Sequence, residues 1–376
     1  MVNLSDPDNE NCMSGFFSSV LRADYGNERE APGPDEKYKT GWQKMAKFEV
    51  RILTEPEYSQ WDQFVEQSVQ GTVFHSSSWI TPAAKMLQFD PVIIGVFDTT
   101  QIIGGCSFFR KDIFPFFKIG TNDVTLTSYG GIVTENKKSN NVREYETRYH
   151  EIISLILEKI RTLNLTNVKL TNGPELVDIR TFTRNGWKET IHYSYIFPLS
   201  GPVEEHLSKK IRWSINKAGK AGIVVRQKWD KDLYWDLTLN TYSRQGKQSP
   251  FSRELLFSFL DTIENTRCGE MWVAETASGQ GAAAEIFIWD PHMAYRWLAA
   301  SHTDYRETEA PTFLLVEVMK HLQEKGHKKF NMMAANTPQL AKFVSSFNPG
   351  LVPYYSVQKI QGIYRIPGMI RSLTTR

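Results

Sequence analysis

One order of predicted elements occurs twice along the chain. Each half holds a β-hairpin, a further strand, a long amphipathic helix, a short strand, a short polar segment and a final alternating strand. The two long helices read "YETRYHEIISLILEKIRTLN" and "PTFLLVEVMKHLQEKG", and the final strands read "IHYSYIFPL" and "LVPYYSVQKI". Hairpins followed by a helical crossover form mixed sheets with helices on their faces. We predict an α/β fold of two tandem units; two unrelated α/β domains that align loosely are the alternative.

The length of 376 residues fits two domains of moderate size. Residues 1–45 are polar and include "EAPGPDEKYKTG", which predicts a flexible leader. The segment "PLSGPVEE" is a natural joint between the copies. We expect one domain over residues 46–200, a second over 201–365, a cleft between them, and a tail over 366–376. Within the first domain we expect the aromatic stretch "KDIFPFFKIGTND" to be irregular and the following "VTLTSYGGIV" to form a strand.

Composition and charge exclude several classes of protein. A net charge of +2 gives no global case for a DNA-binding protein. Cys12, Cys106 and Cys268 are far apart and form no CxxC or Cys/His cluster, so we expect neither a disulfide framework nor a metal site. No run approaches eighteen apolar residues, and the N-terminus lacks a signal-peptide pattern. We therefore expect a cytoplasmic protein with no integral membrane segment.

The segment "SHTDYRETEAPTFLL" leads from a predicted strand into the second long helix. Helix N-termini favour anions, and proline suits the first turn. This order of elements resembles the GNAT-type N-acyltransferases, in which two central strands splay apart and hold the arm of an acyl-CoA between them. The GNAT phosphate loop is richer in glycine, so an ordinary capped helix is the alternative. The resemblance implies an acyl-CoA (acetyl-CoA) site at Ala299, Ala300, Ser301, Arg306, Thr308, Ala310, Pro311 and Thr312.

Four further segments extend the resemblance to most of the chain. They read "TVFHSSSWI", "SYGGIV", "LSKKIRWSINKAGKAGIVV" and "PQLAKFVSSFNPGLVPYY". Their order is similar to that of the FemAB-like branch of the GNAT superfamily. The resemblance implies transfer of an acyl group from acyl-CoA to the amine of an amino-sugar or peptide-like acceptor, in cell-surface glycan biosynthesis. Two alternatives are transfer from an aminoacyl-tRNA to a cell-wall precursor, and a non-catalytic polar-ligand-binding protein.

The family pattern also implies substrate-binding residues. It places an aromatic residue and a strand at the substrate cleft, and cations on the first helix of the second unit. Many members read "F-K-x-x-F-G" where this chain has Val344 in place of the lysine. The chain also lacks the long charged helical hairpin of the tRNA-dependent enzymes, which favours acyl-CoA. The matching residues are Trp79, Tyr129, Gly130, Gly131, Arg212, Asn216 and Lys217.

Acylation of an amine needs a base and a donor to the oxyanion. Glu285 stands in the otherwise apolar "AAAEIFIW", where desolvation raises the pKa of a carboxylate, while a salt-bridged glutamate is the alternative. His302 and Asp304 follow the strand that should splay, and either could be the base. Backbone N–H groups at 299–301 would polarise the thioester.

Two basic segments complete the candidate site. "TYSRQGKQSPFSR", with Tyr242 and Arg244, would suit a sugar phosphate or carboxylate, or be a solvated loop. "KKIRWSINKAGKAGIVV" has five basic residues and no acidic one. We expect its helix beside the interdomain cleft, where Arg212 and Lys217 hold a phosphate-bearing substrate or join the domains; a nucleic-acid surface is the third possibility.

Overall fold

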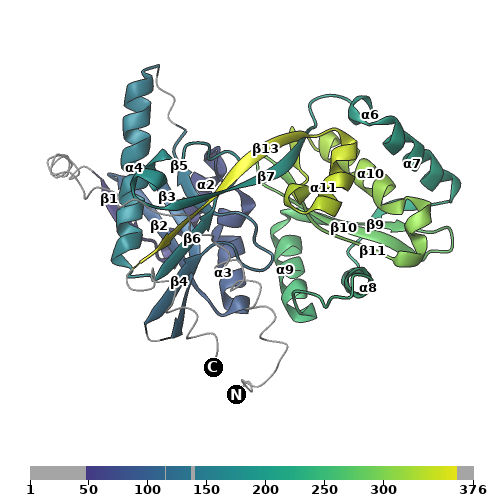
Figure 1. Cartoon of the computed structure of the whole chain (residues 1–376), viewed down its shortest axis with the longest axis horizontal. Helices are drawn as coiled ribbons and strands as arrows, with labels where there is room; N and C mark the ends of the chain where they lie inside the picture. Colours follow the sequence, from purple (N-terminus) through teal and green to yellow (C-terminus); the bar gives the residue numbers. More distant parts are fainter. Residues whose placement is uncertain (1–47, 115, 137–139, 362–376) are drawn as a thin grey trace, which may run out of the picture.

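The computed structural model describes residues 48–114, 116–136 and 140–361. The predicted leader 1–45 and tail 366–376 lie outside these residues. Figure 1 shows two lobes side by side, with the long helix α4 on the outer side of one and the helices α7 and α10 in the other.

The first half contains the predicted helices, hairpin and strands in the predicted order. Helices α2 and α3 bury apolar side chains spaced along one face, and Asn141 caps α4 by accepting a hydrogen bond from the backbone N–H of Glu144. The elements are β1 (Glu49–Ile52), η2 (Glu55–Glu57), α2 (Tyr58–Gln67), η3 (Val73–His75), α3 (Ser77–Leu87), β2 (Asp90–Asp98), β3 (Gln101–Phe114), β4 (Phe117–Thr121), β5 (Gly131–Thr134), α4 (Val142–Thr162), β6 (Asn167–Thr171), α5 (Arg180–Arg184) and β7 (Lys188–Pro198).

The second half follows the same plan with two added helices before its hairpin. The side chains of Ser208, Asp230 and Ser252 cap α7, α8 and α9 in turn. The elements are α6 (Val203–His206), α7 (Lys209–Lys220), β8 (Val224–Gln227), α8 (Lys231–Ser243), α9 (Arg253–Thr266), β9 (Gly269–Glu275), β10 (Gly281–Trp289), β11 (Ala294–Ser301), η4 (Thr303–Thr308), α10 (Ala310–Glu324), β12 (Lys329–Asn331), η5 (Ala334–Asn336), α11 (Pro338–Val344), η6 (Ser345–Phe347) and β13 (Gly350–Ile360).

The halves exchange their last strands. The sheet order is β1-β2-β3-β4-β6-β13-β7-β12-β11-β10-β9-β8, with β5 paired to β3. Strand β13, from the end of the second half, lies between β6 and β7, and β7, from the end of the first half, pairs with β12. Figure 1 shows the yellow β13 crossing into the lobe of α4. The two units are therefore joined by continuous strand pairing.

Two segments of the first half differ from the prediction. The aromatic stretch 111–123, expected to be irregular, forms the end of β3 and all of β4, which pair as a hairpin. The strand expected over 124–133 is shorter, because only Gly131–Thr134 forms β5. Alternation of apolar residues does not distinguish an extended loop from a strand when pairing partners are unknown.

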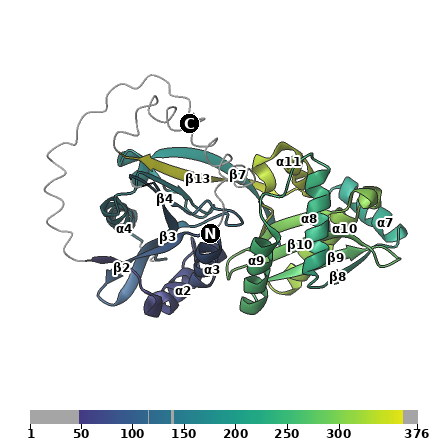
Figure 2. The same cartoon turned by 90° about the horizontal axis from the view of Figure 1, so that it is seen from below.

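An aromatic cluster fills much of the junction between the halves. The Phe74 ring lies 5.2 Å from the Trp79 ring and 5.7 Å from that of Tyr295, and Trp79 lies 5.4 Å from Trp297. The buried carboxylate of Asp290 accepts hydrogen bonds from the Val73 backbone N–H and the Tyr295 hydroxyl. Figure 2 shows the same junction from below, with α9 and α3 facing each other across it.

Candidate active site

Two central strands of the second half splay apart. The parallel strands β11 and β12 pair at only two positions, Ala294 with Phe330 and Tyr295 with Asn331. Residues 296–301 continue β11, but within the described chain no strand pairs with that edge beyond Tyr295. The open edge is the feature expected of a strand pair that holds an extended ligand arm.

Asn331 is the residue at which the second strand turns away. Its Oδ1 accepts hydrogen bonds from the Ser194 hydroxyl at 2.6 Å and from the Met333 backbone N–H at 3.0 Å. Its Nδ2 donates to the Tyr129 hydroxyl at 3.3 Å. Met333 then takes a left-handed conformation with φ of +62°, and the chain leaves the direction of β12. The buried amide of Asn331 thus keeps the splay open and connects it to the first half.

The open edge of β11 presents the backbone N–H of Ala299. The His302 N–H donates to the Ala282 carbonyl on the neighbouring strand β10, so backbone groups at alternate positions point the other way. Ser301 is one of these, and its N–H and carbonyl are both bonded to the Thr241 hydroxyl of α8 at 3.1 Å. The same alternation directs the N–H of the exposed Ala299 toward the open edge. Ala299 is therefore the position at which β11 can donate to a ligand.

The equivalent strand pair of the first half is closed. After β4 and β6 pair in parallel, the Asn122 side chain donates to the Thr171 carbonyl at 2.8 Å and accepts from its N–H at 2.7 Å. Gly130 packs on this amide, because a Cβ there would lie 2.5 Å from Asn122 Nδ2. Gly131, at φ of +83°, lies against Asn172 in the same way. Among the residues that the structure describes, only the second half thus offers an open strand edge of this kind.

The open end of β11 carries both the histidine and the aspartate expected there. His302 Nδ1 accepts a hydrogen bond from the Asp304 backbone N–H at 3.3 Å and lies 3.9 Å from the Asp304 carboxylate. The His302 side chain is 34% exposed, so a substrate can reach the ring. An imidazole is the side chain best suited to take up a proton near neutral pH.

The first turn of α10 is less suited to phosphate than expected. The Ala310 N–H donates to the Thr308 hydroxyl, Pro311 has no N–H, and the Thr312 N–H donates to the Glu309 carbonyl. The exposed carboxylate of Glu307 lies at the same corner. Since these donors are used and carboxylates are near, an anion here would depend on side-chain cations.

Such cations surround the corner. Arg244 and Lys247 lie in the exposed connection after α8, which is bonded to β11 through Thr241, and Arg306 is exposed on η4. Tyr242 is half-buried, and burial raises the pKa of its hydroxyl. The structure thus brings the predicted Tyr242, Arg244 and Arg306 to the same end of β11.

Glu285 lies in a buried ion pair. Its side chain is 1% exposed, and the Arg296 guanidinium binds it through two N–H groups, with Nε at 2.7 Å. Burial acts to lower the pKa of Arg296, but the adjacent carboxylate raises it above its ordinary value. Because the Glu285 carboxylate is buried and occupied by Arg296, whereas His302 is reachable from solvent, the geometry favours His302 over Glu285 as the base.

Arg296 places a positive charge next to α11, the helix that lacks the lysine of the family pattern. Val344, which stands at that position, is fully buried, and Lys342 is exposed. The Arg296 guanidinium lies 5.4 Å from the centre of the Phe343 ring. A cation therefore does lie against α11, although it comes from β11.

The residues expected at the substrate cleft of the first half are buried in the junction. Trp79 and Tyr129 are each 1% exposed, and Gly130 and Gly131 are buried. Trp79 Nε1 donates to the Thr127 hydroxyl at 3.0 Å. In this structure these four residues pack the two halves together and do not line an open surface.

The basic helix α7 does not lie beside the junction as expected. It packs on α10 and η6, and both views show it at the end of the second lobe away from the first. Arg212 is exposed, so it does not join the domains. Lys217 Nζ lies 3.6 Å from Glu307 at the α10 corner and 5.1 Å from the ring centre of Trp213, which is 56% exposed. The helix therefore flanks the candidate donor site.

A polar groove between the halves contains none of the predicted site residues. It has a volume of about 550 Å³ and lies near the ends of β11 and β12 opposite to the open end. One wall carries Asp62 and Glu66, and the other carries Arg267, Lys325 and Lys328. Asp62 and Glu66 belong to α2, whereas the three cations follow α9 and α10, so only the tertiary fold brings the two walls together.

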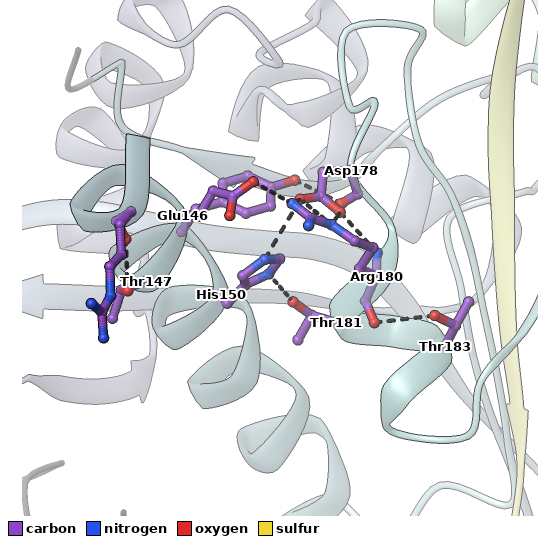
Figure 3. A network of polar contacts seen from close by, with 9 residues as sticks. Glu146, Thr147, His150, Asp178, Arg180, Thr181 and Thr183 are labelled. Carbon is purple, nitrogen blue, oxygen red and sulfur yellow. Dashed lines mark hydrogen bonds and ion pairs between the residues drawn. The ribbon is translucent and has the colours of Figure 1, made fainter. Parts of the chain in front are cut away.

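A further polar cluster joins α4 to α5 (Figure 3). His150 Nδ1 lies 2.7 Å from the Thr181 hydroxyl, and Nε2 lies 3.7 Å from the Asp178 carboxylate. Arg180 binds both Asp178 and Glu146. The order of hydroxyl, imidazole and carboxylate is that of a nucleophile with its base. Thr181 is only 3% exposed, however, so the cluster fixes α5 on α4 and offers no reachable nucleophile.

Comparison with known proteins identifies the class of fold. Residues 206–339 match the family model described as an acetyltransferase (GNAT) domain, and this range contains the splayed strands and the α10 corner. No curated protein sequence matches the chain. Residues 206–339 of the second half are therefore similar to a GNAT acetyltransferase domain.

Solved structures extend the match over both halves. FemX superimposes with a TM-score of 0.67 at 12% identity, covering 87% of this chain and 100% of its own. A conserved protein of unknown function from Bacteroides thetaiotaomicron gives 0.55 at 12% identity, covering 82% and 99%. L-PGS from Bacillus licheniformis gives 0.51 at 13% identity, covering 87% and 99%. The predicted α/β fold of two GNAT-like units, with its likeness to the FemAB-like branch, is confirmed.

Proposed function

We propose that the protein is an N-acyltransferase that moves an acyl group from an acyl-CoA thioester, such as acetyl-CoA, to the amine of a polar acceptor. The open edge of β11 beyond Tyr295 carries this proposal, because it leaves the Ala299 N–H free to bond an extended arm. The acyl-CoA arm, with its amide groups, is such a ligand. The division into units 46–200 and 201–365 is part of the same proposal.

The cations at the open end of β11 would hold the charged part of the donor. Arg306 and Lys217 flank the first turn of α10, where the phosphate groups of the CoA would lie. Because the N–H groups of that turn are already bonded, these side chains would supply most of the attraction. Thr308, Ala310 and Thr312 shape the corner, and Thr308 does so by bonding to the Tyr305 carbonyl and the Ala310 N–H.

The chemical step would be direct attack of the amine on the thioester carbonyl. The acceptor's ammonium group first loses a proton to Nδ1 of His302, the ring nitrogen with the lone pair, and the long hydrogen bond from the Asp304 N–H that orients the ring is given up. The amine nitrogen then bonds to the carbonyl carbon, and the Ala299 N–H stabilises the oxyanion. The carbon–sulfur bond breaks, and the CoA thiolate takes up the proton that the attacking nitrogen loses as it becomes the amide nitrogen. His302 then releases its own proton to solvent. Glu285 would have a positioning role, because its ion pair with Arg296 fixes β11 just after Tyr295, where the open edge begins.

The acceptor would be recognised at the connection after α8. Arg244 and Lys247 are exposed there, and Tyr242 presents a half-buried hydroxyl. Such groups suit a carboxylate, a phosphate or the hydroxyls of a sugar. An amino-sugar or a peptide-like amine is therefore the acceptor class that the site favours.

A screen of acyl-CoA thioesters against amino-sugar and amino-acid acceptors, with released CoA as readout, tests this proposal. Replacing the base with His302→Gln should lower kcat by about 100-fold with little change in donor affinity. Lys342→Gln, an exposed change away from the site, serves as the control. Thioester turnover with every acceptor at the rate of buffer alone would reject the proposal and favour a non-catalytic ligand-binding protein.

A second candidate is transfer from an aminoacyl-tRNA. The basic helix α7 favours it, since Lys217 and the exposed Trp213 lie beside the α10 corner, and Arg212 is exposed on the same helix. Cations and aromatic side chains together are suited to single-stranded nucleic acid. Salt-sensitive binding of tRNA, together with indifference to CoA, would establish this candidate over the first.

A further inference from the structure

The β3–β4 hairpin presents two phenylalanines to solvent at its tip. Phe114 is 65% exposed and Phe116 is 81% exposed, which is the highest value for any large apolar side chain in the described part of the chain. Phe114 pairs with Phe117 where β3 turns into β4. The hairpin forms the lower end of the α4 lobe in Figure 1. Paired aromatic side chains at a protruding tip leave apolar surface that a partner can cover.

Basic side chains follow the tip on both strands. Arg110 and Lys111 precede it on β3, and Lys118 follows it on β4. One carboxylate, Asp112, lies among them and pairs with Arg110 at 3.2 Å and Lys118 at 3.4 Å. The segment 110–118 therefore carries a net charge of +2, from three cations and one anion.

The backbone of Phe116 and Lys118 is held by the connection between α4 and β6. The Thr166 hydroxyl donates to the Phe116 carbonyl and accepts from the Lys118 N–H, both at 3.1 Å. The Thr166 N–H donates to the Lys118 carbonyl at 2.8 Å. The last turn of α4, just before this connection, adds Lys159 and Arg161 to the same end of the lobe, and Arg161 pairs with Glu158. Backbone that is already held by hydrogen bonds loses little conformational freedom when its side chains enter another phase.

We propose that this hairpin docks the protein on an anionic lipid bilayer, with Phe114 and Phe116 in the interface and the surrounding cations on the headgroups. Apolar tips with a basic collar match a membrane surface, because the bilayer covers the rings and the anionic lipids neutralise the cations. The hairpin is separate from the splayed strands, so the inference holds independently of the transferase proposal. No helix in the described part of the chain is long and apolar enough to cross a bilayer, so the contact would be peripheral.

Flotation of the full chain with lipid vesicles tests the docking. We expect binding to phosphatidylcholine vesicles that contain phosphatidylglycerol, and weaker binding to pure phosphatidylcholine or at high salt. The double variant F114S/F116S should lower the bound-to-free ratio at least about tenfold, since two phenylalanine side chains no longer enter the interface. The control V177S changes another apolar residue that is 72% exposed, far along the chain, and should bind as the parent does.

Three outcomes would overturn the inference. The first is that the parent chain fails to float with anionic vesicles. The second is that F114S/F116S floats as well as the parent and keeps the parent's circular dichroism and melting temperature. The third is that sedimentation shows the parent to be a dimer and the double variant a monomer with unchanged vesicle binding. That last result would assign the tip to self-association.

Discussion

Burial of His75 makes the stability of the fold depend on pH. His75 is fully buried in η3, and its Nδ1 accepts a hydrogen bond from the Thr72 N–H. Burial lowers the pKa of this imidazole to about 4, against an ordinary value of 6.5. Between these values the unfolded chain holds a proton that the folded chain does not, so acid favours unfolding. The stability that this group contributes is fully present above the pKa of His75 in the unfolded chain. It is lost as the pH falls toward the pKa of His75 in the folded chain.

The magnitude follows from that difference. Integrating between pH 7.5 and pH 5.0 gives a loss of about 2 kcal/mol from this one group. The variant His75→Asn keeps an acceptor near the position of Nδ1 but cannot take up a proton. Its cavity lowers stability equally at both pH values, so the comparison cancels that cost.

Urea unfolding of the parent and the variant at the two pH values measures the effect. The parent should lose about 2 kcal/mol more than His75→Asn between pH 7.5 and pH 5.0. Other histidines, including His192 and His327, contribute equally to both proteins. Equal losses, within the error of the unfolding curves, would refute the reasoning that His75 is held neutral by burial.

Three further substitutions test the packing around the candidate site. Arg296→Met should destabilise the fold by about 3–5 kcal/mol in urea, because it leaves Glu285 charged and unpaired, and adding Glu285→Gln should recover most of the loss. Trp79→Ala should lower the free energy of unfolding by about 3–5 kcal/mol in the same measurement, because the ring fills the junction between the halves. A variant as stable as the parent would show that the aromatic cluster does not join the halves. Asn331→Ala should cost about 1–3 kcal/mol, since the Met333 N–H and the Ser194 hydroxyl lose their buried acceptor, and unchanged unfolding would contradict the role given to this amide.

Much of the fold could be predicted because apolar periodicity marks elements directly. The long helix α4 and the hairpin β2–β3 lie where their patterns indicated, and the repeated order is present in both halves. The exchange of β7 and β13 could not be predicted, since the alternation of apolar residues in a strand does not show which strand it pairs with. The β3–β4 hairpin was expected to be irregular for a similar reason, because its exposed phenylalanines break the alternation that a half-buried strand shows.

The candidate site was predictable only in part. The positions of His302 and Asp304 follow from the order of strand and helix, which the sequence shows. The pairing of Glu285 with Arg296 depends on two strands lying side by side in one register. The placement of α7 at the outer end of its lobe depends on its packing against α10 and η6, which are far away in the sequence, so the residues of α7 alone do not predict it. The predicted leader and tail remain predictions.

The central claim is that the open edge of β11 binds the donor, and calorimetric titration of acetyl-CoA tests it most directly. Ala299→Pro removes the Ala299 N–H, which faces the opening, and keeps the bonds from β11 to β10. Ala299→Val retains the N–H and is the matched control. We expect the parent and Ala299→Val to bind acetyl-CoA and the folded Ala299→Pro to bind at least about tenfold more weakly. Absence of binding by the parent, or equal binding by all three, would contradict the claim.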